Sequence, residues 1–121
     1  MTLTMSGVAT QKDPSPLRIV VRLDRASSVI VLRGDVDAYS WPALSEALSR
    51  VIASRQGEVV VDLADVAFID SAGVHALAVA RDLLIRRARS LTLRSPSTTA
   101  TKVLGVFGLS DLIDASQERL P

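Results

Sequence analysis

Ser71 is the residue of this sequence whose neighbours most favour a chemical role, within the segment Asp70-Ser71-Ala72-Gly73. The apolar, β-branched run at residues 59–63 predicts a strand buried on both faces, and a long amphipathic pattern begins directly after Gly73. Aspartate and serine are preferred at helix N-caps because their side-chain oxygens accept hydrogen bonds from first-turn N–H groups. We therefore predict a tight strand-to-helix junction that leaves the Ser71 hydroxyl outside the core.

A serine hydrolase is one interpretation of this junction, because a serine nucleophile can also stand at a strand-to-helix turn. That turn needs glycine two residues before the serine, and Ile69 is there instead. His75 follows Ser71 by four residues in the same expected helix, so it would lie beside the hydroxyl and not face it across a substrate pocket. We therefore expect no enzymatic activity, and we expect His75 to be an exposed or rim residue.

The composition argues against metal, cofactor, nucleic-acid and membrane functions. The chain has no cysteine and one histidine, and it contains no calcium-loop spacing and no glycine-rich phosphate loop. Fourteen basic residues against thirteen acidic ones create no strong field, and the basic cluster Arg86-Arg87-Ala88-Arg89 lacks stacking aromatics. No apolar stretch approaches the ~20 residues that span a bilayer, and the N-terminus lacks a signal-peptide pattern. We expect a cytoplasmic protein that binds no metal, cofactor or nucleic acid and does not insert into a membrane.

Alternating strands and helices are expected to hold the junction in place. Residues 1–16 mix polar side chains with prolines, which predicts a flexible tail before a single domain over residues 17–121. The expected strands are residues 17–23, 29–33, 59–63 and 91–93, with a small edge strand at 112–113. The first expected helix begins at Ser40 and has Pro42 in its first turn, and the second begins at Ser71 and runs to about Arg89. A third runs from near Thr98 to Phe107, and residues 116–120 form the stub of a last one.

This order of elements predicts the fold class. The first two strands are close enough in sequence to form an antiparallel hairpin, whereas the later strand–helix–strand units imply parallel pairing. We therefore predict an α/β fold with a mixed sheet of four or five strands.

Two interpretations of Ser71 remain open once catalysis is set aside. A hydroxyl that another enzyme phosphorylates needs exposure and a defined backbone, but no base of its own. A hydroxyl that only caps the helix needs neither a kinase nor a partner. Residue chemistry alone does not choose between them.

Three segments, in the right order, resemble the motifs of STAS domains, the sulfate transporter and anti-sigma factor antagonist domains. The likeness covers residues 17–116 and is greatest to bacterial anti-sigma factor antagonists. The segments are Gly34-Asp35-Val36-Asp37-Ala38-Tyr39-Ser40-Trp41-Pro42-Ala43-Leu44, then Phe68-Ile69-Asp70-Ser71-Ala72-Gly73-Val74 preceded by Val61-Asp62-Leu63, and finally Val103-Leu104-Gly105-Val106-Phe107-Gly108-Leu109.

The resemblance implies a fold, a function and partners. The helices of a STAS domain pack mainly on one face of the mixed sheet. An anti-sigma factor antagonist binds an anti-sigma factor that is also a serine kinase, and so releases the sigma factor for transcription. The kinase phosphorylates the motif serine, here Ser71, which switches the antagonist off, and a serine phosphatase reverses the modification. The alternative within the family is a STAS subunit of a membrane complex that transports lipid or anions, acting by protein–protein contact.

The resemblance also implies which residues form the partner-binding surface. Ala72 stands where the family often has serine or threonine, which leaves Ser71 as the one acceptor in the motif. His75 stands where small residues are common, which could change the choice of partner. The expected surface around Ser71 comprises Asp37, Tyr39, Ser40, Asp70, Ala72, Gly73, Val74 and His75.

Overall fold

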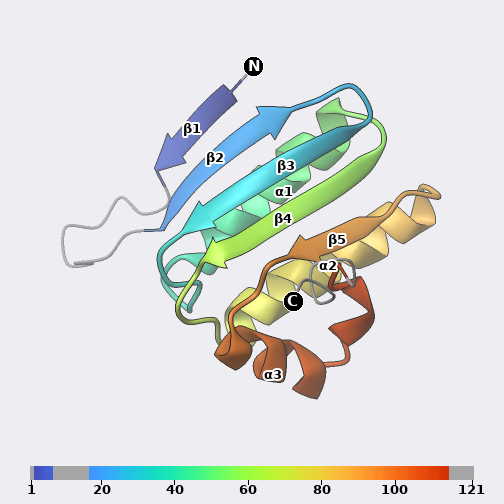
Figure 1. The fold of residues 1–121 in the computed structure, drawn as a ribbon. Helices are drawn as coiled ribbons and strands as arrows, with labels where there is room; N and C mark the ends of the chain where they lie inside the picture. Colours follow the sequence, from blue (N-terminus) through green and yellow to red (C-terminus); the bar gives the residue numbers. More distant parts are fainter. Residues whose placement is uncertain (1, 7–16, 115–121) are drawn as a thin grey trace, which may run out of the picture.

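The computed structural model of the protein describes residues 2–6 and 17–114 and shows a mixed five-stranded sheet with three α-helices (Figure 1). The strands lie in the sheet in sequence order, β1-β2-β3-β4-β5. The pairs β1–β2 and β2–β3 are antiparallel, whereas β3–β4 and β4–β5 are parallel. The strand bounds are β1 Thr2–Ser6, β2 Arg18–Leu23, β3 Ser27–Arg33, β4 Glu58–Asp65 and β5 Leu91–Arg94.

The two parallel connections decide where the helices lie. Helix α1 (Trp41–Ser54) joins β3 to β4, and α2 (Ser71–Arg86) joins β4 to β5. Such crossovers are almost always right-handed, so two steps in the same direction across a sheet put both helices on the same face. Figure 1 shows α1 and α2 together behind the sheet, with α3 (Thr98–Val106) and the 3₁₀ turn η1 (Ser110–Leu112) beyond β5.

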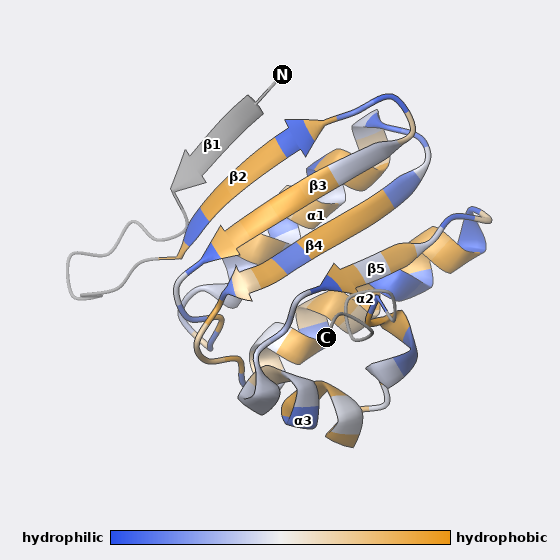
Figure 2. Cartoon of the chain, viewed as in Figure 1, coloured by the Kyte–Doolittle hydropathy of each residue, from blue (hydrophilic) through white to orange (hydrophobic). Residues whose placement is uncertain are grey.

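The core lies between the sheet and these two helices. Alternate strand residues face opposite sides of a sheet, and Val59, Val61 and Leu63 of β4 are fully buried. Leu48 of α1 and Leu77 of α2 cover them as part of one cluster of aliphatic side chains. Figure 2 shows hydrophobic residues along β2, β3 and β4, with hydrophilic residues gathered at the strand ends and on the helix surfaces.

The predicted architecture is confirmed, including the mixed sheet, the opening hairpin and the helices on one face. The prediction of a flexible tail over residues 1–16 is wrong in part, because Thr2–Ser6 form β1 and pair with β2. Residues 7–16, and the helix stub expected at 116–120, lie outside the described residues. The edge strand expected at 112–113 is also wrong: Leu112 ends η1, and Ile113 makes a single parallel bridge to Leu93.

Arg89 has a structural role that the sequence did not reveal. Helix α2 ends at Arg86, three residues before the predicted end, and Ala88 takes a left-handed backbone conformation with φ of 56°. This turn directs the Arg89 guanidinium toward two carbonyl groups, those of Ile52 at 2.9 Å and Gly57 at 2.9 Å. Arg89 therefore ties the end of α1 and the start of β4 to the end of α2.

Candidate functional site

Two loops meet at the carboxyl ends of the parallel strands β3 and β4, which is where α/β sheets usually bind their ligands. The Val36 N–H donates to the Phe68 carbonyl at 2.9 Å, and the Asp70 N–H donates to the Val36 carbonyl at 3.1 Å. The Gly34 N–H donates to the Asp65 carbonyl at 3.1 Å. These bonds continue the β3–β4 ladder beyond the strands and hold the loop after β3 against the start of α2.

Gly73 allows the helix to come this close. A Cβ atom at this position would lie 2.5 Å from Val36 Cγ1, 3.0 Å from the Val36 carbonyl oxygen and 3.0 Å from Ile69 Cγ1. Cβ contacts this short require a neighbour to move, and one of the atoms in the way belongs to the backbone. The absence of a side chain at Gly73 therefore fixes the distance between α2 and the Val36 loop.

Asp70, and not Ser71, caps helix α2. One Asp70 oxygen, Oδ1, accepts from the Ala72 N–H at 3.0 Å and from the Gly73 N–H at 3.2 Å. Ser71 is the first helical residue and is exposed, and its hydroxyl forms no hydrogen bond with the described residues. The predicted junction is confirmed, and the capping role left open for Ser71 belongs to its neighbour.

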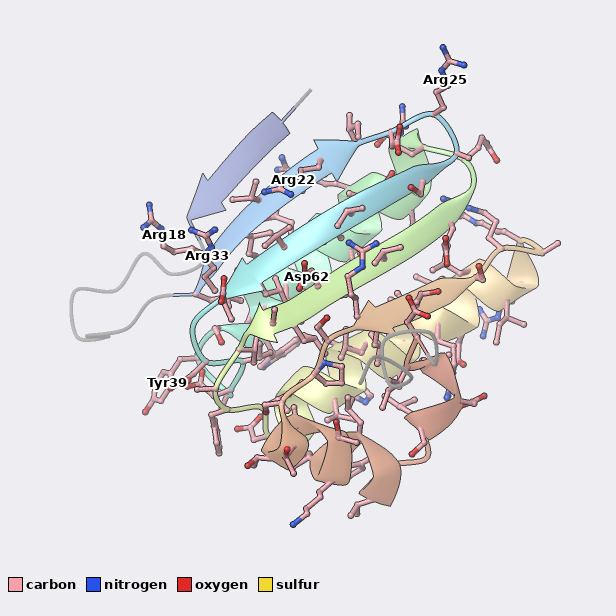
Figure 3. All side chains as sticks on the ribbon, in the orientation of Figure 1. Arg18, Arg22, Arg25, Arg33, Tyr39 and Asp62 are labelled. Atoms are coloured by element: carbon pink, nitrogen blue, oxygen red, sulfur yellow. The ribbon has the colours of Figure 1, made fainter. Side chains whose placement is uncertain are left out.

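Ser40 and Asp37 shape the loop after β3. Ser40 is 1% exposed, and its hydroxyl donates to the Asp35 carbonyl at 2.8 Å and accepts from the Asp37 N–H at 3.0 Å. Asp37 Oδ1 accepts from the Tyr39 and Ser40 N–H groups at 3.0 and 3.1 Å. Ser40 precedes α1 but makes no side-chain cap bond to it, because its hydroxyl is used inside the loop. The loop is thus closed by its own polar groups, and Tyr39 points away from the body of the protein (Figure 3).

The four aromatic residues of this chain are all at its surface. Tyr39 is 75% exposed, Phe68 is 48% exposed and Trp41 is 36% exposed, and these three belong to the two site loops or the first residue of α1. Phe107, at the end of α3, is 50% exposed. Aromatic side chains are enriched at protein interfaces, and a fold with an aliphatic core has no structural need for three of them here.

The structure sorts the predicted surface residues by accessibility. Gly73, Val74 and Ser40 are buried and position the loops from beneath, and that they contact a partner stays a prediction. The apolar character of Phe68, in the loop between buried Val66 and Ile69, predicts that it anchors this loop in the core. This prediction is wrong: Phe68 is exposed and, with Trp41, joins the accessible surface. The exposed members are Ser71, Tyr39 and His75, and the half-buried ones are Asp37, Asp70 and Ala72.

The chemistry available at this site is limited. Over residues 2–6 and 17–114, no three His, Cys, Asp or Glu side chains are grouped as metal ligands would be. Across the same ranges, every helix is too short or too polar to cross a membrane. What the site offers is an exposed serine, a capping carboxylate and an aromatic rim, an arrangement suited to protein contact and to modification of the serine hydroxyl.

Comparison with known proteins agrees with this geometry. Residues 19–114 match the family described as "Mlab, STAS domain". An anti-sigma-B factor antagonist of Listeria monocytogenes is 34% identical over 86 residues, which span 70% of this chain and 75% of the relative. The anti-sigma factor antagonist SpoIIAA in its unphosphorylated form has the same fold, with a TM-score of 0.72, 23% identity and coverage of 79% of this chain and 85% of SpoIIAA. SpoIIAA of Bacillus in its phosphorylated form gives a TM-score of 0.67 at 22% identity, over 85% and 99% of the two chains.

Proposed function

Because the chain belongs to the STAS domain family, we propose that it is an anti-sigma factor antagonist switched by phosphorylation of Ser71. In this account it binds an anti-sigma factor that is also a serine kinase, and binding releases the sigma factor. The kinase transfers phosphate to the Ser71 hydroxyl, and a serine phosphatase removes it. The chain itself is a cytoplasmic binding module without catalytic activity.

The observation that carries this proposal is the placement of Ser71. Ser71 is exposed as the first residue of α2, and Asp70 supplies the side-chain cap, so the Ser71 hydroxyl is not used for capping. The backbone around it is fixed by the Val36 ladder and by the close packing of Gly73. A kinase therefore meets an accessible acceptor in a defined conformation, beside exposed aromatic side chains that a partner protein can cover.

The same geometry explains why a phosphate would act as an off switch. A phosphoserine carries nearly two negative charges, and a helix N-terminus favours an anion by ~0.3–1 kcal/mol. Asp70 already accepts from the Ala72 and Gly73 N–H groups, so these donors are not free for the phosphate. Repulsion between the phosphate and the Asp70 carboxylate is on the order of several kcal/mol at ~5 Å before screening by salt.

The partner interface adds a second cost. Burying a doubly charged group in a surface shaped for a neutral hydroxyl costs several kcal/mol more unless a cation pairs with it. Water screens the exposed phosphate in the free chain, whereas a partner that displaces this water strengthens the repulsion from Asp70. Both contributions therefore act against binding, and together they exceed the effect of the helix dipole. Phosphorylation is therefore expected to abolish partner binding while leaving the fold intact.

Intact-mass measurement tests this proposal. The chain is incubated with ATP and each anti-sigma factor kinase of its own organism, and fragment masses locate any added phosphate. We expect one phosphate, on Ser71, that is absent from Ser71→Ala and retained in the matched exposed-serine variant Ser110→Ala. Phosphate elsewhere, or none with every kinase, would overturn the switch, and co-purification with a transporter ATPase would favour the alternative STAS function.

A further inference from the structure

The face of the sheet opposite α1 and α2 carries three exposed arginines, Arg18 and Arg22 on β2 and Arg33 on β3. Their strand neighbours Ile19 and Leu32 are fully buried under the helices, so the alternation of side chains turns the arginines to the other face. Figure 3 shows Arg18 and Arg33 close together at one end of the sheet and Arg22 further along β2. We call these three residues the arginine face.

The positions of these three arginines do not stabilise the fold. Arg18 lies directly opposite Arg33 in the β2–β3 register, and like charges in this position destabilise a sheet. Arg33 forms an ion pair with Asp65 at 3.3 Å, whereas Arg18 and Arg22 make no ion pair or side-chain hydrogen bond with any described residue. Two guanidinium groups that have no partner among the described residues are thus held on this face, and their donors suit carboxylates.

The rest of the same face restricts what can bind there. The β3–β4 register places Glu58 and Asp62 of β4 on this face, opposite Ser27 and Val31 of β3. Asp62, which Figure 3 labels, has Arg94 of β5 opposite it on its other side. A membrane or a nucleic acid covering the whole face would press its phosphates against these two carboxylates. Val31 and Val60 are 7% and 4% exposed, so a second copy of the chain would bury little new apolar surface. A narrow acidic strand that lies along β2 and β3 would pair with the guanidinium groups of the arginine face without lying on the carboxylates of Glu58 and Asp62.

We propose that the arginine face binds an acidic segment of a partner protein, rich in Asp and Glu, laid along β2 and β3. Residues 7–16 and 115–121 do not supply such a segment, because the first range contains one Lys and one Asp and the second contains one Glu and one Arg. The proposal concerns a surface separate from Ser71 and stands whether or not Ser71 is phosphorylated.

Titration of the full chain with a fluorescent oligo-glutamate peptide tests this proposal. Anisotropy gives the affinity at low ionic strength, and NMR amide shifts locate the bound peptide. The test variant is Arg18→Glu/Arg22→Glu, and the control with the same change in charge is Arg86→Glu/Lys102→Glu, whose residues are exposed on α2 and α3. Thermal unfolding checks that both variants fold, and the test variant should melt above wild type because Arg18→Glu places an acid opposite Arg33.

We expect peptide affinity to fall by about tenfold or more in the test variant and to change by less than about twofold in the control. The amides that shift should belong to β2 and β3. An equal loss in both variants, or shifts centred on the helices, would overturn the proposal. So would binding of phosphatidylserine vesicles in preference to the peptide, or dimerisation that the test variant abolishes.

Discussion

Replacing Gly73 with alanine should test how the loops and α2 are held together. The added Cβ would lie 2.5 Å from Val36 Cγ1 and 3.0 Å from the Val36 carbonyl oxygen. Forcing a methyl group into a packed site costs about 1–3 kcal/mol, whereas glycine to alanine in a helix gains at most ~1 kcal/mol, and less in the first turn. We therefore expect Gly73→Ala to lower the free energy of unfolding by about 1–2 kcal/mol.

Urea unfolding followed by circular dichroism measures this change, and Gly105→Ala is the matched control. Gly105 also lies in a helix, α3, but a Cβ there would meet only the flexible Ser110 hydroxyl, at 3.2 Å. The control should be neutral or more stable by up to ~1 kcal/mol. If Gly73→Ala matches the control, then α2 and the Val36 loop are not in the close contact described above, and our account of how the site is positioned is wrong.

Three further substitutions have defined outcomes, each measured by urea unfolding. Ser40→Ala removes the hydroxyl that bonds the Asp35 carbonyl and the Asp37 N–H, and should cost about 1–3 kcal/mol, against less than ~0.5 kcal/mol for exposed Ser49→Ala. Arg89→Met removes the Arg89 donor from the Gly57 carbonyl and the shorter of two arginine bonds to the Ile52 carbonyl, and should cost about 1–3 kcal/mol. An effect no larger than that of exposed Arg86→Met would refute its bridging role. Asp70→Ala removes the α2 cap and should cost about 0.5–2 kcal/mol, whereas Asp70→Asn should restore most of that stability.

Strands β2 to β5, the three α-helices and the exposed serine could be predicted because each depends on local pattern, whereas the sequence predicts a tail where β1 lies. The β-branched run of β4 is apolar and must be buried whatever the arrangement of the other elements. The strand–helix–strand order of the sequence then implies parallel pairing of β4 with its neighbours. The exposure of Ser71 follows from its position between a strand and an amphipathic helix. These features need no knowledge of distant contacts.

The residues that were misjudged depend on tertiary contacts instead. Phe68 is apolar in a loop between buried residues, and its sequence does not reveal that the ladder between Val36 and Ile69 turns it outward. Ser40 has the signature of a helix cap, but a nearer partner, the Asp35 carbonyl, takes its hydroxyl. Arg89 resembles a solubilising charge until the chain reversal at Ala88 brings it to α1. For Phe68 and Arg89 a contact across the fold overrides the local preference, whereas for Ser40 a bond within its own loop does so.

Calorimetric titration of the cognate anti-sigma factor into two forms of this chain tests the central claim most directly. One form is unmodified and the other carries phosphate on Ser71, with circular dichroism confirming that both are folded. Since repulsion and burial of the phosphate each cost several kcal/mol, we expect affinity to fall by about a hundredfold or more on phosphorylation. Equal affinities for the two forms would show that Ser71 is not the switch.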